Sequence, residues 1–592
     1  NLSDGKTIWK TELEDFKLSN IYLRKIFSKE DVIYIKIESV ESPTIRKYIL
    51  IAIEKSTGKL RWSREHDNGA ILPFSNSIYL VNSMNVKNNP GTKYTEWDIL
   101  TGKDKRTLEP TTFTGGRCWN IKATENFITS IDESYYFDRK NFSTILNGRG
   151  IRSQCQVGQA FAYGLMYNLP HACNCGTVLR GVSAVSGGSN IPNGAVTPIL
   201  IKGNENKIEE LPMSNGWLIF RGNAERSSFI ANELPSELKL GWSIKLGDTP
   251  LTQITGAGDI GFTAEPEKHR VFALDLNSGK VIWNFTTEGR VTIPPTLYKG
   301  VCLIADHAGW VYCLNAKKGT IVWQFQAAPE QKYMCSFGQL ESSWPVRSGV
   351  LVLDNLAFFS AGRTGVTDGG IHLYAINIET GHQVWKRIFT NLMPNDLLTA
   401  YLNKYLIQGR AIINPIDGKD LPFPPGLKEN VLHSCGYETG TNVSLLDSLA
   451  STDAGQIWIR KSAPGNSRGS GNSVAFDKNS TVFSFRGHPV RKGDDPWRCE
   501  VRSAGKYNWT NKTTRQQMFS MVLSSSYIYC TGVPEFGDTQ EKPCLWIISL
   551  IDGKEIQKIP LEGVPTIEGL SSIDGKLFLT TQDGQVNCFN KK

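Results

Sequence analysis

A short pattern recurs along the chain and constrains its fold more than any other feature. Each clear copy has a small residue, an acid or amide two positions later, a glycine, and a tryptophan four residues after that glycine. The clear copies are IAIEKSTGKLRW (51–62), FALDLNSGKVIW (272–283), YCLNAKKGTIVW (312–323) and YAINIETGHQVW (374–385). Repetition of one short unit over a long chain predicts a repeat architecture rather than a set of unrelated domains.

Every part of the pattern has a structural role in a β-hairpin. The alternating apolar residues before the acid predict a strand with one buried face. The acid or amide accepts hydrogen bonds from turn amides, and the glycine adopts the positive φ of a tight turn. The tryptophan begins the next strand and offers a large apolar face to a neighbouring sheet. Docking of this kind is expected of Trp62, Trp283, Trp323 and Trp385.

The strands before these turns repeat as well. GVCLIADHAGWVYCLN (300–315) aligns without gaps to GKLFLTTQDGQVNCFN (575–590), and weaker turns occur across most of the chain. Sheets of equal size that pack side by side predict an all-β fold, a single β-propeller of about eight four-stranded blades. We expect residues 1–592 to form this one domain, with long insertions at 393–410 and 491–517.

The two ends of the chain suggest how the ring closes. The last repeat stops at Asn590, before its glycine and tryptophan, and Gly5 and Trp9 supply these residues at the correct spacing. We therefore expect the N-terminal strand, with Trp9 as its docking residue, to complete the last blade. Such closure removes the exposed sheet edges that make open β structures prone to aggregate.

These motifs resemble the pyrroloquinoline-quinone-like (PQQ-like) propeller superfamily, which includes quinoprotein alcohol dehydrogenases and a lipoprotein that helps assemble outer-membrane barrels. Within the superfamily, the chain resembles large exported bacterial PQQ-like repeat proteins more closely than it resembles these enzymes. That closer likeness is carried by residues 117–123, Cys155, residues 170–175, 216–221 and 337–345. The resemblance implies a propeller fold and export, whereas fold alone does not determine function.

Charge and hydropathy exclude two classes of partner. The net charge of +8 is spread over 592 residues, and the densest basic stretch, 491–515, also contains Asp494, Asp495 and Glu500. A nucleic-acid interface would concentrate its basic residues, so we expect no nucleic-acid binding. The sequence has no apolar run long enough to span a membrane. Because it begins at Asn1 and carries no signal peptide, we interpret it as a mature exported chain.

The chain has twelve cysteines and lacks a CxxCH haem motif. Cys530 and Cys544 flank a loop as facing hairpin strands would, so they are predicted to form a disulfide. The family resemblance implies a second disulfide, between Cys118 and Cys155. Cys173 and Cys175, near His171, fit a disulfide better than a zinc site, because a C-x-C spacing alone is a weak metal signal. Cys313 and Cys588 fill the small-residue slot of the repeat, which favours buried free thiols.

No catalytic, cofactor or metal residues can be assigned from the sequence. Quinoprotein dehydrogenases cover their quinone with a disulfide between adjacent cysteines, and this sequence contains no Cys-Cys pair. The favoured function is therefore a non-catalytic scaffold that binds other proteins of a larger exported, redox or other, assembly and needs no cofactor. The alternative is a PQQ- or metal-dependent oxidoreductase, or a binder of small ligands in the central channel.

Overall fold

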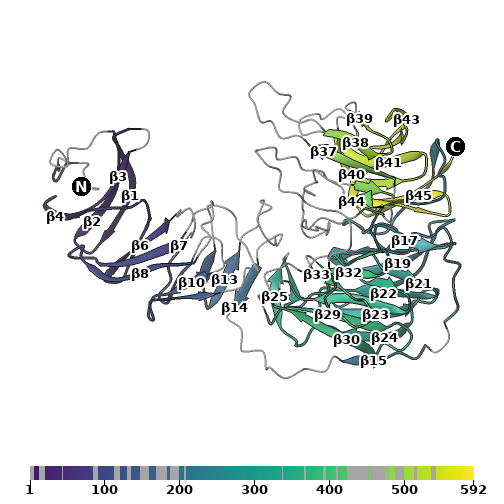
Figure 1. Cartoon of the computed structure of the whole chain (residues 1–592), viewed down its shortest axis with the longest axis horizontal. Helices are drawn as coiled ribbons and strands as arrows, with labels where there is room; N and C mark the ends of the chain where they lie inside the picture. The colour runs from purple at the N-terminus through teal and green to yellow at the C-terminus, as the bar shows by residue number, and fades with distance from the viewer. Residues whose placement is uncertain are drawn as a thin grey trace. The chain divides into compact units, whose positions relative to one another are not determined.

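The computed structural model describes the chain except for these residues: 1–5, 12–19, 43–44, 85–90, 113–120, 130–134, 147–158, 169–182, 187–198, 206–207, 337, 364, 366–367, 391–394, 396, 409–410, 423–450, 453–454, 457–473, 478, 487–498, 512–515 and 535–541. The described residues form antiparallel β-sheets, with one short 3-10 turn at Pro266–Lys268. None of these residues belongs to a helix long and apolar enough to cross a membrane. The prediction of an all-β fold is confirmed (Figure 1).

The chain divides into two compact units. The first comprises residues 1–147 and 154–161, and the second comprises 148–153 and 162–592. The sheets of the first unit run in chain order. They are β1 (Ile21–Lys29), β2 (Val32–Val40), β3 (Arg46–Glu54) and β4 (Leu60–His66); β5 (Ala70–Phe74), β6 (Ser77–Met84), β7 (Gly91–Asp98) and β8 (Asp104–Thr112); and β9 (Phe127–Thr129), β10 (Tyr135–Asp138) and β11 (Ser143–Leu146).

The second unit repeats the same four-stranded meander. Its regular sheets are β17 (Thr255–Ala257), β18 (Ile260–Glu265), β19 (Arg270–Asp275) and β20 (Val281–Thr286); β21 (Thr296–Tyr298), β22 (Val301–Ala305), β23 (Trp310–Asn315) and β24 (Ile321–Gln326); β27 (Leu351–Leu353), β28 (Leu356–Ala361), β29 (Ile371–Asn377) and β30 (Gln383–Phe389); β36 (Val474–Phe476), β37 (Ser480–Arg486), β38 (Cys499–Gly505) and β39 (Trp509–Asn511); and β40 (Gln516–Leu523), β41 (Tyr527–Pro534), β42 (Cys544–Ser549) and β43 (Glu555–Pro560). The inner strands β17 and β21 contact each other, as do β21 and β27, β36 and β40.

The last sheet of this unit is completed by a strand from the start of the unit. Its order is β16 (Leu238–Lys245), β46 (Gln585–Lys591), β45 (Lys576–Thr581) and β44 (Pro565–Ile573). β16 and β46 are antiparallel, with Ser243 opposite Asn587, and β44 contacts β17 (Figure 1). Closure by a strand distant in sequence protects the edges of the first and last sheets.

The prediction that the N-terminal strand closes the ring is therefore wrong. β16 already occupies the edge of β46 that this strand was expected to fill. Trp9 belongs to the first unit, where its indole Nε1 donates to the carbonyl oxygen of Lys55 at 2.8 Å and its ring lies against Gly58. The Gly-to-Trp spacing at the N-terminus is thus a docking signal for a different sheet.

Tryptophan rings lie against turn glycines throughout both units. A Cβ added to Gly319 would lie 2.7 Å from Cδ2 of Trp283, and the same close approach joins other pairs. These pairs are Trp62 with Gly102, Trp242 with Gly279, Trp323 with Gly381, Trp385 with Gly418 and Trp509 with Gly553. The Trp323 indole also donates to the carbonyl oxygen of Ile378 at 2.7 Å. Because these glycines have positive φ and contact an indole directly, a side chain there would meet both strain and overlap.

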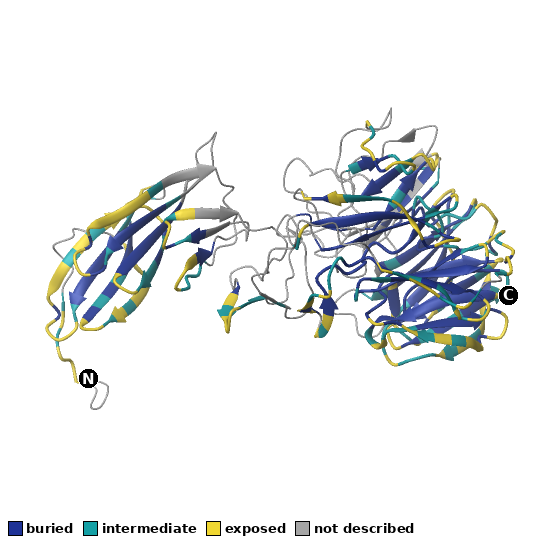
Figure 2. Ribbon diagram, turned by 90° about the horizontal axis from the view of Figure 1, so that it is seen from below, coloured by how far each residue is buried: buried dark blue, intermediate teal, exposed yellow. Residues whose placement is uncertain are grey.

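The two stretches predicted to be insertions contain sheet strands instead. Residues 393–410 include β31 (Thr399–Tyr401) and β32 (Tyr405–Gln408), which pair with β33 (Ala411–Ile413). Residues 491–517 include β38 and β39. Residues 393–410 contain no glycine with a tryptophan four residues later. In 491–517, Gly505 and Trp509 have that spacing, but Val501 stands in place of the acid or amide, so the repeat was not recognisable there. Burial differs between the strands of a sheet. The middle strands are buried and the outer strands are partly exposed (Figure 2).

Candidate functional site

A segment of the chain, residues 215–230, crosses one end of the inner strands of the second unit. We call it the capping segment. Its backbone exchanges hydrogen bonds with five different sheets, one of them through Phe476 N to Ser227 O at 2.9 Å. The other contacts are Trp217 N to Gly256 O and Gly256 N to Trp217 O, both 2.9 Å, Leu297 N to Leu218 O, 2.7 Å, Ala400 N to Ala224 O, 2.8 Å, and Leu523 N to Ser228 O, 2.8 Å. The segment thus ties together inner strands that are far apart in sequence.

Buried polar groups fix the capping segment in place. The Gln253 carboxamide accepts hydrogen bonds from Trp217 Nε1 and Arg221 N, both at 2.8 Å, and donates to the carbonyl oxygens of Glu568 and Leu570. All four hydrogen bonds of this amide are therefore satisfied. Arg221 also forms an ion pair of 2.7 Å with Glu568, and both side chains are nearly inaccessible.

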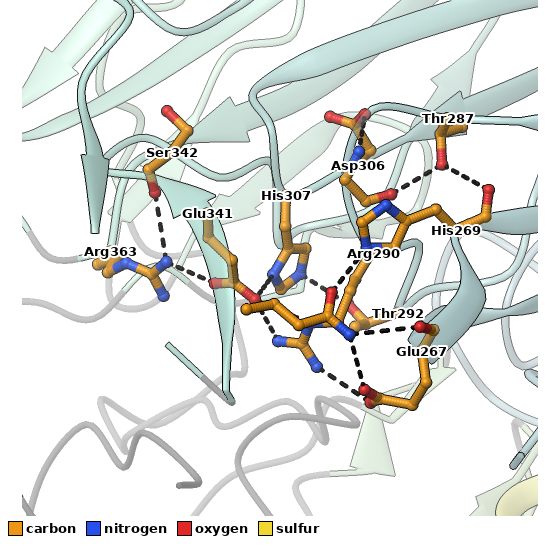
Figure 3. A network of polar contacts seen from close by, with 12 residues as sticks. Glu267, His269, Thr287, Arg290, Thr292, Asp306, His307, Glu341, Ser342 and Arg363 are labelled. Carbon is orange, nitrogen blue, oxygen red and sulfur yellow. Dashed lines mark hydrogen bonds and ion pairs between the residues drawn. The ribbon is translucent and has the colours of Figure 1, made fainter. Parts of the chain in front are cut away.

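A second buried network lies among loops that join the strands at the other end of these sheets. Its centre is Glu341, which accepts from Arg290 through one carboxylate oxygen and from Arg363 through the other (Figure 3). The distances are 2.8 Å from Arg290 Nε and 2.6 Å from Arg363 Nη2. All three side chains are 1% exposed. A buried carboxylate shared by two guanidiniums is stable only because both partners remain in place.

The network extends from Glu341 to two further side chains. His307 Nδ1 lies 3.2 Å from the Glu341 carboxylate, and its Nε2 lies 3.0 Å from the Thr292 hydroxyl (Figure 3). Arg290 reaches Glu267 at 3.5 Å, and the Gln339 amide donates to the same carboxylate at 3.0 Å. The charges therefore alternate through the cluster, and each acid contacts at least one guanidinium.

Asp306 holds the loop that carries Arg290. Its carboxylate accepts hydrogen bonds from Gly289 N at 3.0 Å, Trp310 N at 2.8 Å and the Tyr312 hydroxyl at 3.1 Å. Burial raises the pKa of Asp306 to about 6, and these donors and His307 act in the opposite direction. The carboxylate is thus kept mainly ionised at neutral pH by the groups it organises.

The ion network anchors a hairpin inserted between the sheets β21–β24 and β27–β30. The hairpin consists of β25 (Tyr333–Ser336) and β26 (Gln339–Ser342), and β25 also pairs with β14 (Ser183–Ser186). Met334 lies opposite Glu341 on the buried face. Cys335 lies opposite Leu340 on the other face, where Tyr333 is 54% exposed and Leu340 is 73% exposed. Alternation along the two strands thus separates an anchored face from an apolar solvent-facing one.

The network is suited to fixing the position of hairpin β25–β26 rather than to acid–base chemistry. Glu341, Arg290 and Arg363 point toward one another and are almost inaccessible, and Glu267 at the edge of the network is one-third exposed. Within the part of the chain that the structure describes, no three His, Cys, Asp or Glu side chains converge as metal ligands. The accessible groups next to the network are those on the outer face of the hairpin.

Part of the second unit matches a known protein family. Residues 239–387 and 307–418, which include the ion network and the hairpin, match the family described as outer membrane protein assembly factor BamB. The matched segments contain the clear copies of the repeat after residue 238. Over residues 239–418, the repeats are similar to this PQQ-like family.

Curated relatives of the propeller match it only in part. The putative dehydrogenase XoxF of Paracoccus denitrificans is 25% identical over 249 residues, which is 36% of this chain and 39% of that protein. The tetrathionate hydrolase of Acidithiobacillus ferrooxidans is 27% identical over 119 residues, 20% of this chain and 19% of that protein. The chain therefore spans well under half the length of these two relatives.

Solved structures similar to the propeller have low sequence identity. A quinohemoprotein alcohol dehydrogenase from Pseudomonas putida HK5 has a TM-score of 0.44 and 10% identity, covering 64% of this chain and 80% of that one. BamB from Moraxella catarrhalis has a TM-score of 0.30 and 15% identity, covering 60% of this chain and 98% of that one.

The predicted cysteine sites have different outcomes. Cys530 and Cys544 are buried, and the structure does not join them in a disulfide. Their predicted facing positions are wrong, because Cys530 pairs with Trp546 whereas Cys544 pairs with Gly532, which places the two cysteines on a diagonal. Cys313 and Cys588 are buried free thiols, as predicted. Cys118, Cys155, Cys173 and Cys175 lie outside the described residues.

Sequence reasoning missed the residues of both buried networks. Arg290 and Arg363 come from two separate loops and Glu341 from strand β26, so no spacing between them is meaningful. The one usable signal was family likeness: residues 337–345 contain Glu341, and residues 216–221 contain Trp217 and Arg221. Neither stretch had an assigned role.

Proposed function

We propose that the propeller is a non-catalytic scaffold that binds another protein of an exported assembly through the outer face of hairpin β25–β26. The observation that carries this proposal is the contrast between the two faces of the hairpin. Glu341 fixes one face to Arg290 and Arg363, while Leu340 and Tyr333 on the opposite face are exposed. Large apolar side chains held rigidly in solvent are typical of protein-binding sites.

Two further features support a scaffold. The capping segment bonds across the inner strands, and its Trp217 and Arg221 side chains are buried there, which favours partner binding on loop surfaces over ligand passage. The matched family is described as an outer membrane protein assembly factor, and the match includes the hairpin. An exported location and a role in assembly are consistent with that description.

The test is co-purification of the tagged full chain from its native source at low salt. Leu340→Glu places a charge at the centre of the proposed contact, so we expect the partner identified with the wild type to be reduced by about tenfold or more. Ile416→Glu is the matched control, because Ile416 is 75% exposed but lies in the turn after β33.

Retention of the same partner by Leu340→Glu, or its equal loss with Ile416→Glu, would contradict the proposed surface. The competing oxidoreductase function is tested on the same preparation. A quinone absorbance band, or dye reduction with simple alcohols after PQQ and Ca²⁺ are added, would contradict a non-catalytic role.

A further inference from the structure

Two lysines face each other across the first two strands of the first unit. The register places Lys25 of β1 directly opposite Lys36 of β2. Directly opposed residues have Cβ atoms about 5 Å apart, and like charges in such a pair are destabilising. Lys36 is only 9% exposed, whereas Lys25 lies on a strand that is largely exposed. The pair therefore combines a buried ammonium with an accessible one.

Each ammonium is held by a carbonyl oxygen of the adjoining sheet. Lys25 Nζ donates to the carbonyl oxygen of Ile71 at 2.8 Å, and Lys36 Nζ donates to that of Gly69 at 2.6 Å. An ammonium has three N–H donors, so these bonds use only part of its capacity. Among the residues that the structure describes, no carboxylate forms an ion pair with either lysine.

The nearest acid is already engaged by other cations. Glu38 is 2% exposed, and its carboxylate pairs with Arg24 and, at 2.8 Å, with Arg46. These two arginines lower the pKa of Glu38 against the opposing effect of burial. Glu38 also acts on Lys36, whose pKa it raises against the lowering by burial, Lys25 and Arg24. One acid thus faces two guanidiniums and two ammonium groups, so positive charge remains in excess.

His66 adds no charge to the region around Lys25 and Lys36. Its Nδ1 lies 2.5 Å from the carbonyl oxygen of Asp67, and burial lowers its pKa to about 4. The ring is therefore neutral at physiological pH. The region around Lys25 and Lys36 carries a local excess of positive charge.

We propose that Lys25 and Lys36 together bind a small oxyanion, a phosphate or carboxylate group, between the sheets β1–β4 and β5–β8. Both ammonium groups are fixed on carbonyl oxygens two residues apart, so their remaining donors can converge on one anion. Charge-assisted hydrogen bonds from two ammonium groups would offset the repulsion between them. The pKa of Lys36 supports this assignment: burial and then Lys25 lower it to about 8, a cost that a bound anion would relieve.

The test is calorimetric titration of the full chain with inorganic phosphate and, separately, with acetate, at constant ionic strength in sodium chloride. We expect the wild type to bind at least one of the two anions and Lys36→Met to bind it about tenfold more weakly or not at all, since each charge-assisted bond contributes roughly that factor. Lys29→Met is the control, because Lys29 lies on the same strand and donates to the carbonyl oxygen of Ser75, but faces Val32.

A second measurement does not depend on affinity. In the NMR titration of the lysine side chains, the pKa of Lys36 should rise when the bound anion is added, while that of Lys29 should not move. Absence of binding by both anions, or equal weakening by Lys36→Met and Lys29→Met, would overturn the proposal. So would a Lys36 pKa unaffected by saturating anion. Lys36→Met removes an unneutralised charge, and an unchanged circular dichroism spectrum would confirm that it folds.

Discussion

The buried network of Glu341, Arg290 and Arg363 depends on the carboxylate of Glu341. This carboxylate neutralises Arg290 and Arg363, and all three side chains are buried. Glu341→Gln keeps the shape but removes the charge, so the buried Arg363 loses its carboxylate and Arg290 retains Glu267 at 3.5 Å. We expect the free energy of unfolding to fall by about 3 kcal/mol in chemical denaturation.

A matched control separates burial from charge. Glu562→Gln removes a carboxylate that pairs with Lys542, but Glu562 is 85% exposed, so its loss should change stability little. An equal effect of the two substitutions would contradict the structural role assigned to Glu341. Neither network was predictable at this scale, because their side chains come from segments far apart in sequence that meet only after folding.

The repeated β-meander is the element that the sequence predicted best. Acid, glycine and tryptophan at fixed spacing define a turn whose backbone requirements are local, so the clear copies could be located without any tertiary information. Trp242 was missed because it does not follow a glycine by four residues, and Trp509 because Val501 stands where the acid or amide of the pattern would precede its glycine, Gly505. For Trp242 the reason is topological: its strand, β16, pairs with β46 from the opposite end of the unit.

Docking of Trp242 on Gly279 gives an element-scale prediction. Trp242→Ala removes the indole that covers this turn, so the free energy of unfolding of the second unit should fall by about 3 kcal/mol. Trp9→Ala is the paired variant, because Trp9 covers Gly58 in the first unit. Differential scanning calorimetry should show each substitution lowering a different transition. If both lowered the same transition alone, the division of docking between the units would be wrong.

At the scale of the whole molecule, the sequence predicted one ring and the structure contains two compact units. Local sequence patterns were enough to predict the all-β class and the repeat. They were not enough to predict which strand pairs with β46 and closes the propeller. Gly5 and Trp9 have the spacing of the missing half-repeat, yet β16 forms the strand next to β46. Pairing between distant strands depends on which edge is free after the other strands have packed, and local spacing carries no information about that.

Cross-linking across β16 and β46 tests the closure of the propeller most directly. Ser243 and Asn587 are opposite each other, at a separation suited to a disulfide, so Ser243→Cys with Asn587→Cys should link on mild oxidation. Ile8→Cys with Asn587→Cys is the comparison, since it would link only if the N-terminal strand closed the ring. We predict that peptide mapping without reduction recovers the first link and not the second. Recovery of the Ile8 link in place of the Ser243 link would contradict the account.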